Sequence, residues 1–132
     1  MSKLTYKDLM VGDWVKMNNG YAKVVELDGE YIHFLDKFGT GISCSAEPIP
    51  LTAEILENNG FNEESDFRWS APDIKKYCIV NEKVFDGPDS WWFCFNVPDK
   101  HKLGHICLFE CGNVHELQHI LKIGKSNIKI EL

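Results

Sequence analysis

The chain almost lacks arginine: Arg68 is the only one among its 132 residues. Arginine forks are the commonest means of recognising phosphate and guanine. The formal net charge of −6 also has the wrong sign for the usual electrostatic footprint of nucleic-acid binding. Nucleic acid is therefore disfavoured as a partner. Four lysines near the N-terminus keep a nucleic-acid-binding module in the N-terminal barrel as an alternative: Lys3, Lys7, Lys16 and Lys23.

Long apolar runs are also missing. No stretch approaches the roughly 20 residues that span a bilayer, so we expect no membrane association. The first residues show no apolar signal core, which predicts a cytoplasmic protein. Five cysteines, an odd number, then indicate reduced thiols without a disulfide. Cys78 and Cys94 each alternate with apolar neighbours, and we expect both to be buried.

Short β-rich runs dominate the first half. Four of them follow one another: 13–18, 21–27, 30–35 and 41–46. Asn19-Gly20 separates the first two and Asp28-Gly29 the next two. Both dipeptides favour the two-residue type I′ turn of tight hairpins. The sequence therefore predicts an SH3-like β-meander barrel over residues 1–50.

The second half predicts an α+β lobe over residues 51–132, either a separate domain or continuous with the barrel. Thr52 is the expected N-cap of a short helix that ends near Asn59, with Gly60 past its end. Five strands are predicted: 66–70, 74–80, 91–97, 103–110 and 127–132. Turns are expected at 71–73, 86–89 and 98–100. Residues 91–97 are apolar on both faces, which predicts a strand covered on both sides, with helix 114–123 on one of them. The fold class is thus α+β, with the barrel followed by an antiparallel sheet under one helix.

Residues 115–119 read H-E-L-Q-H, an instance of H-E-x-x-H. In zinc proteases this pattern supplies two histidine ligands and a glutamate that acts as general base. A zinc-dependent hydrolase is therefore one alternative, with His115 and His119 as ligands and Glu116 as base. Catalytic zinc needs a third protein ligand. The only carboxylate after the motif is Glu131, in the predicted terminal strand.

The helix that would carry this motif has an apolar stripe of Val114, Leu117 and Leu121. This stripe must be buried, so we expect His115 and His119 to face water on the opposite side. We therefore predict no metal, no cofactor and no catalytic residue in this segment.

A second metal interpretation joins residues that recur every fourth position: Cys107, Cys111, His115 and His119, with His101 and His105 upstream. Zinc sites use these residue types, but usually from paired short knuckles. Cys107 and Cys111 would lie about 13 Å apart along a strand, too far for one tetrahedral ion. A structural zinc site is therefore disfavoured. No spacing selects a Cys–His pair for nucleophilic catalysis either.

Aromatic residues of the barrel are a further candidate site: Trp14, Tyr21, Tyr31, Phe34 and Phe38. Together they could line a groove for proline-rich peptides or stacked bases. The alternative, which we favour, is that they fill the small barrel and its junction with the second half.

Four segments carry a resemblance to a family of small uncharacterised proteins from gut-type anaerobic bacteria and their phages or mobile elements. They read P-I-P-L-T-A-E-I-L-E-N-N-G-F (48–61), V-H-E-L-Q (114–118), I-K-I-E-L (128–132) and V-G-D-W-V (11–15). The resemblance implies a small accessory or interaction protein and supplies no functional residue. With the residues above, it predicts a non-enzymatic cytoplasmic protein whose partner is another protein.

Overall fold

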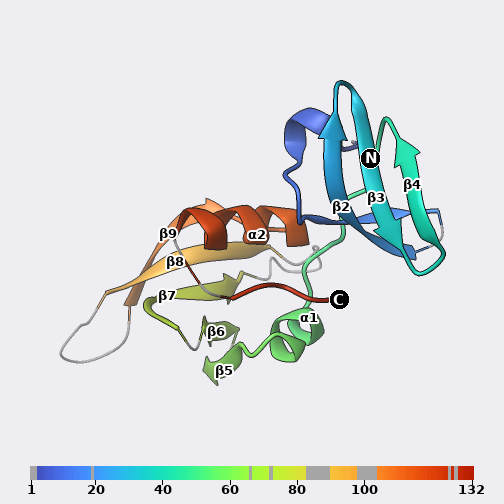
Figure 1. Cartoon of the computed structure of the whole chain (residues 1–132). Coiled ribbons are helices and arrows are strands. Elements are labelled where there is room, and N and C mark those ends of the chain that lie inside the picture. The colour runs from blue at the N-terminus through green and yellow to red at the C-terminus, as the bar shows by residue number, and fades with distance from the viewer. Residues whose placement is uncertain are drawn as a thin grey trace.

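The computed structural model describes residues 3–18, 20–65, 67–71, 73–82, 90–97, 104–124, 126 and 128–132. They form two antiparallel sheets in sequence order, β1-β2-β3-β4 and β5-β6-β7-β8-β9, and the long helix α2 lies along the second sheet (Figure 1). A short 3₁₀ turn, η1 (Tyr6–Asp8), precedes the first sheet. The predicted α+β class is confirmed.

The first sheet is the meander that the sequence predicts. Its strands are β1 (Trp14–Met17), β2 (Gly20–Asp28), β3 (Tyr31–Asp36) and β4 (Gly39–Ser43). One face buries a small core that the segments before β1 and after β4 complete: Leu9, Val15, Ala22, Val24, Ile32 and Ala46. The sheet alternates between buried and exposed residues because only one face is covered.

The turns of this meander lie one residue away from their predicted positions. Gly20 already belongs to β2 and pairs with Met17; Asn19 lies outside the described residues. Asp28 pairs with Tyr31, so Gly29 and Glu30 form the second loop. Gly29 has a φ of +59°, whereas the φ of Glu30 is not positive. A single positive φ at the first central residue fits a type II′ turn, and the predicted type I′ turn needs two.

The predicted closed barrel is not observed. In the described residues β1 and β4 are the two ends of the sheet. Only Lys16 and Glu47 pair along the free edge of β1, through backbone bonds of 2.8 and 3.0 Å. On β4, the Phe34 ring lies directly over Gly41, where a Cβ would come within 2.5 Å of the ring. Glycine at position 41 thus lets Phe34 cover the core of an open sheet.

The second lobe begins with α1 (Ala53–Asn58). Thr52 caps this helix by accepting a bond from the Ile55 N–H at 3.2 Å, and Gly60 follows with a φ of +88°, as predicted. The sheet strands are β5 (Asn62–Ser65), β6 (Arg68–Ala71), β7 (Ile74–Asn81), β8 (Trp91–Val97) and β9 (Gly104–Glu110). The helix α2 spans Val114–Ile123, the predicted range.

Strand β8 has buried side chains on both faces between Trp91 and Cys94, as predicted, whereas Phe95 further along it is exposed. On one face the stripe Val114, Leu117 and Leu121 of α2 packs on the larger core, together with these sheet residues: Trp69, Ile79, Trp91 and Phe93. The Trp69 and Trp91 rings lie 5.2 Å apart at its centre. The other face holds a smaller buried cluster: Cys78, Val80 and Cys94, with Trp92 against it. Burial of Cys78 and Cys94 is thereby confirmed.

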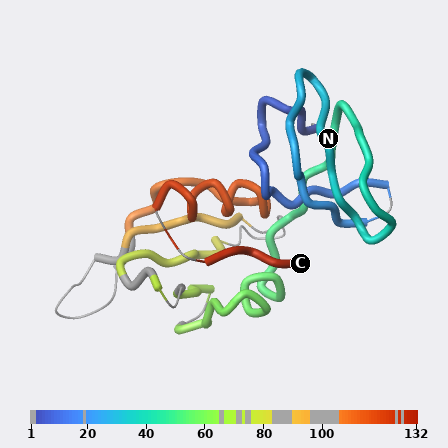
Figure 2. Tube along the Cα trace, in the orientation of Figure 1, coloured from blue at the N-terminus to red at the C-terminus, as the bar shows by residue number. Residues whose placement is uncertain are grey.

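One strand of the second lobe was not predicted, and one predicted strand is wrong. Strand β5 is not predictable from the pattern, because Asn62, Glu63 and Glu64 are exposed polar residues without an apolar alternation. The predicted last strand is not part of a sheet, although Ile130 is buried as its pattern suggested. Residues 128–132 run past α1 toward the first sheet instead (Figure 2). The turns predicted at 86–89 and 98–100 lie outside the described residues.

Candidate functional site at the junction of the two lobes

The H-E-x-x-H segment lies where the two lobes meet. His115 is only 6% exposed and His119 is partly buried, so the prediction that they face water is wrong. At about 100° per residue, His115 lies roughly 130° and His119 roughly 170° around the helix from the centre of the apolar stripe, so the helical period placed them correctly on the far side from the stripe. The segment that leads into β1 covers this side of α2.

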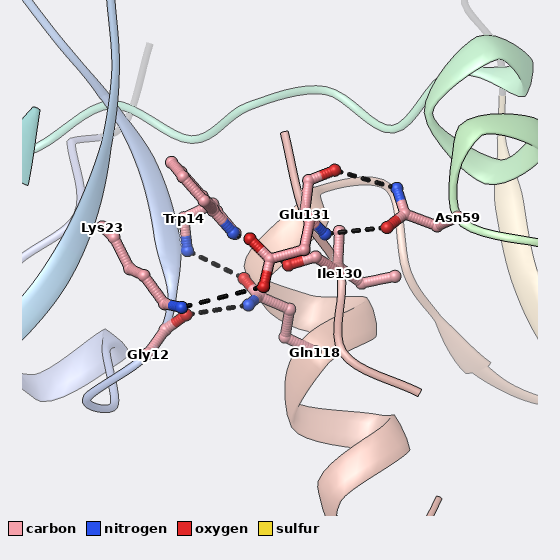
Figure 3. A network of polar contacts seen from close by, with 7 residues as sticks. All are labelled: Gly12, Trp14, Lys23, Asn59, Gln118, Ile130 and Glu131. Atoms are coloured by element: carbon pink, nitrogen blue, oxygen red, sulfur yellow. Dashed lines mark hydrogen bonds and ion pairs between the residues drawn. The ribbon is translucent and has the colours of Figure 1, made fainter. Parts of the chain in front are cut away.

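Gln118, between the two histidines, makes the clearest contacts of the junction (Figure 3). Its Oε1 accepts a bond from the Trp14 N–H at 2.8 Å, and its Nε2 donates to the Gly12 carbonyl at 2.9 Å. One side-chain amide thus pairs with two backbone groups at the start of β1. No local pattern marks Gln118 for this role, because its partners lie more than 100 positions away in the chain.

His119 pairs with Asp13. The His119 Nε2 lies 2.5 Å from the Asp13 Oδ2, and Asp13 is only 3% exposed. The same Oδ2 accepts a bond from the Met10 N–H at 2.8 Å, across the turn in which Gly12 has a φ of +99°. Buried charges are stable only when paired and hydrogen-bonded. The ring nitrogen that would bind a metal through Nε2 is therefore already engaged within the chain.

Of the other motif residues, Glu116 is engaged within the chain, whereas the buried Nδ1 of His115 has no hydrogen-bond partner among the described residues. The Glu116 carboxylate accepts a bond from the Asn113 side chain at 2.8 Å. The His115 ring lies edge-on to that of His119, 5.7 Å between centroids, and burial lowers the pKa of His115. Because the pKa is lowered, the neutral imidazole is favoured in the folded protein. Nothing in this geometry presents the glutamate to a water molecule held by both histidines.

Metal ligands do not gather in threes in the described part of the chain, counting histidine, cysteine, aspartate and glutamate. Cys107 lies exposed on β9, whereas Cys111 is fully buried in the core beneath α2. His101 lies outside the described residues, and only the backbone of His105 is described. The second metal interpretation therefore gains no support from the arrangement of its two cysteines.

The C-terminal segment completes the junction. The Trp14 indole N–H donates to the Ile130 carbonyl at 2.9 Å. Asn59 holds Glu131 through both backbone groups, at 2.7 and 3.1 Å, and the Glu131 carboxylate lies 4.0 Å from the Lys23 ammonium (Figure 3). The start of β1 is therefore bonded both to α2 and to the C-terminal segment, which is bonded in turn to Asn59 at the end of α1.

A cavity of about 320 Å³ opens beside these contacts, and the Asp13–His119 pair lies on its wall. An imidazole–carboxylate pair can in principle hold and move a proton. A nucleophile for acyl transfer would have to lie within hydrogen-bond reach of His119. Among the described residues of the wall, Ser126 is the only serine, threonine or cysteine, and its hydroxyl bonds to Asp73 at 3.1 and 3.2 Å. A nucleophilic triad is therefore not assembled on this wall.

The aromatic residues of the first lobe do not form one groove. Trp14 belongs to the junction and Phe34 to the core of the first sheet. Tyr21, Tyr31 and Phe38 are exposed. Tyr21 lines a cavity with Ile55 of the second lobe, and Phe34 borders a different one.

The lysines of the proposed basic patch are scattered in the same way. Lys23 faces Glu131 and the Trp14 ring, and Lys7 lies over Tyr6. Lys3 and Lys16 border a cavity that Asp36 and Glu47 also line. No continuous basic surface results from these described positions, which leaves the nucleic-acid alternative without a supporting feature.

The edge of the second sheet shows the opposite character. Among the described residues β9 has a neighbour, β8, on one side only. Its apolar side chains are exposed: Ile106 by 55%, Leu108 by 43% and Phe109 by 57%. Phe95, the partner of Ile106 on β8, is also exposed. Leu108 has no partner, because the register with β8 shifts between Phe109 and Cys107.

Comparisons of the chain with protein-family models, with curated proteins and with solved structures gave no match. The resemblance noted from the four segments therefore stays a prediction. In the described residues, no helix has both the length and the apolar character needed to cross a membrane.

Proposed function

We propose that this protein is a non-enzymatic interaction module, and that β9 accepts an extended segment of a partner protein as a sixth strand of the second sheet. The observation that carries the proposal is a seven-residue strand with exposed Ile106, Leu108 and Phe109, which has β8 as its one neighbour among the described residues. Such an edge offers backbone donors and acceptors to an added strand, and its side chains provide specificity.

The two edges of this sheet differ in how well they are protected against pairing with other chains. At the other edge, β5 has four residues, two of them glutamates. Short, charged edge strands discourage pairing with other chains. In β9 the only charged side chain is Glu110, at its end, and no lysine or proline interrupts the strand. The β9 edge therefore lacks these protections, apart from the irregularity at Leu108.

The charges around β9 indicate what the partner segment should carry. Glu110 ends the strand, and Glu82 lies 3.8 Å from the Cys107 sulfur. β8 and β9 contain no lysine or arginine. Complementary charge raises association rates and excludes wrong partners. We infer an extended segment that alternates apolar residues with lysine or arginine.

The remaining parts of the proposal follow the sequence. The first lobe is proposed to be an open variant of an SH3-like sheet that the junction holds against the second lobe. A cytoplasmic accessory role, associated with phages or mobile elements as the resemblance implies, is compatible with a protein that acts by binding.

The test selects peptides from a random display library on the full chain and measures their binding by fluorescence anisotropy. The matched variants are Ile106→Lys on β9 and Ile42→Lys on β4, two exposed isoleucines on edge strands of the two sheets. We expect I106K to weaken binding by about tenfold or more and I42K to leave it nearly unchanged. Bound peptide should also slow amide hydrogen exchange in β9.

Three results would overturn the proposal. Peptides that protect another surface, or that are equally sensitive to both variants, would place the site elsewhere. Self-association that I106K abolishes would make a second copy of the chain the occupant. Binding of single- or double-stranded DNA or RNA that weakens steeply with salt would favour the nucleic-acid alternative.

A further inference from the structure

Three cysteines form a row across neighbouring strands of the second sheet. Cys78 of β7 pairs with Cys94 of β8, and Cys94 pairs with Cys107 of β9. The sulfur atoms of Cys94 and Cys107 lie 3.3 Å apart, and all five cysteines are free thiols. The row therefore brings two reduced sulfurs close together at the edge of the sheet.

These two thiols differ in their access to solvent. Cys107 is exposed, whereas Cys94 is fully buried against Val80 and Trp92. Burial, followed by the contact with Cys107, raises the pKa of the Cys94 thiol. A small oxidant from solution therefore reacts first with Cys107, while the buried Cys94 beside it remains a protonated thiol.

We propose that Cys94 and Cys107 are a reversible oxidation site, a dithiol that a hydroperoxide such as hydrogen peroxide converts to a disulfide. The Cys107 thiolate attacks one peroxide oxygen, the O–O bond breaks, and a sulfenic acid and hydroxide result. The Cys94 sulfur then attacks the Cys107 sulfur, an S–S bond forms, and the sulfenic oxygen leaves as water with the Cys94 proton. In total two thiols lose two electrons and two protons, and one peroxide becomes two waters.

The backbone already allows this bond. Residues directly opposite each other in antiparallel strands have Cα atoms about 4.5–5.5 Å apart, within the range of disulfides, about 4.4–6.8 Å. The sulfurs need to approach by only about 1.3 Å to reach the S–S bond length of about 2.05 Å. A side-chain rotation supplies such a movement without changing the strand pairing.

Cys78 is a poorer partner for Cys94 despite its place in the row. It is 2% exposed, and its thiol bonds to the Arg68 guanidinium. An oxidant would have to reach one of two buried thiols before a Cys78–Cys94 disulfide could form. Oxidation begins at the exposed member of a pair. Because Cys107 is the exposed thiol of the row and Cys94 is the cysteine next to it, the disulfide should form between these two.

The experiment treats the reduced full-length chain with hydrogen peroxide, blocks the remaining thiols with an alkylating reagent and maps the peptides by mass spectrometry. We expect an intact mass lower by about 2 Da before alkylation, the two thiol hydrogens, and one crosslink between Cys94 and Cys107 that dithiothreitol reverses. The proposal does not depend on partner binding, since the chain is oxidised alone. A β9 that binds no peptide would leave this result unchanged.

Two variants sharpen the result. C107S should prevent the mass change, and C44S, which removes the other exposed cysteine, should not. In C94S, sulfenic acid at Cys107 should accumulate and be trapped by dimedone. A crosslink between Cys78 and Cys94, a crosslink between molecules, or over-oxidation of Cys107 in the wild type without a disulfide would each overturn the proposal. Because the wild-type map needs no variant, it decides the matter even if C94S fails to fold.

Discussion

The lobe junction contains histidine and carboxylate side chains and the β9 edge contains a cysteine, but the surroundings of these reactive residues differ. At the junction, the side chains of Asp13, Gln118 and His119 all bond within the chain. On β9, apolar side chains and the Cys107 thiol are exposed beside an unpaired backbone edge. Polar side chains that bond within the chain thus stabilise the junction, whereas the exposed apolar surface of β9 is proposed for binding.

This comparison predicts opposite responses to mutation in the two regions. Changes at the junction should reduce stability, because they remove partners from partly buried groups. Changes on β9 should leave stability nearly unaltered and change binding or oxidation instead.

The largest expected effect is that of Gln118→Ala. It leaves the Trp14 N–H and the Gly12 carbonyl without their partner. An unsatisfied buried donor or acceptor costs about 1–3 kcal/mol, so we expect the free energy of unfolding to fall by about 2–4 kcal/mol. Urea denaturation checks this. Gln118→Glu keeps the acceptor for Trp14 but loses the donor to Gly12, so its stability should lie between those of the wild type and Gln118→Ala. A cost of Gln118→Ala below about 0.5 kcal/mol would contradict the role given to Gln118.

Oxidation should act on the β9 region in the stabilising direction. A disulfide between residues 13 positions apart removes conformational entropy from the unfolded chain, worth about 2–3 kcal/mol. The midpoint of urea denaturation should rise after peroxide treatment and return after reduction. C107S should show no rise. An oxidised protein less stable than the reduced one would show that the bond strains the sheet.

The pH dependence of stability should report on His115. Its pKa is lowered in the folded protein by burial. The unfolded chain therefore binds more protons than the folded one below the ordinary histidine value of about 6.5. Stability should be complete above that pH and fall as the pH decreases toward the lowered folded pKa. His115→Leu should flatten this part of the curve, and an unchanged curve would contradict the assignment.

The smallest expected effect on stability is that of Ile106→Lys. The side chain is more than half exposed, so the free energy of unfolding should change by no more than about 0.5 kcal/mol. The same variant is expected to lose peptide binding. A large destabilisation would show that β9 packs against part of the chain and is not a free edge.

Local patterns in the sequence predicted much of this fold. The bounds of α2 follow from Asn113 before it and Gly124 after it, and its buried stripe follows from the helical period. Asn113 stands at the N-cap position, although its side chain bonds to Glu116 and not to a backbone N–H. Hairpins were likewise predictable from their glycines, with an error of one residue in the turns.

Long-range packing decided what the sequence did not reveal. The side of α2 that carries His119 would face water on an isolated lobe, but Asp13, 106 positions away, covers it. The apolar alternation of Ile128 and Ile130 reflects real burial, yet the backbone there bonds to the side chains of Trp14 and Asn59 and not to a strand. The closeness of Cys94 and Cys107 depends on the register of β8 and β9, which residue spacing alone does not specify.

The most direct test of the account is a double-mutant cycle on Asp13→Ala and His119→Ala, measured by urea denaturation with and without a zinc chelator. If the H-E-x-x-H segment joins the lobes, the two residues should be coupled by about 1–3 kcal/mol, and the chelator should not change that value. Additive effects of the two substitutions would contradict the junction. If the untagged wild-type protein instead contains stoichiometric zinc and the chelator lowers its free energy of unfolding, the zinc-site interpretation of the H-E-x-x-H segment would be supported.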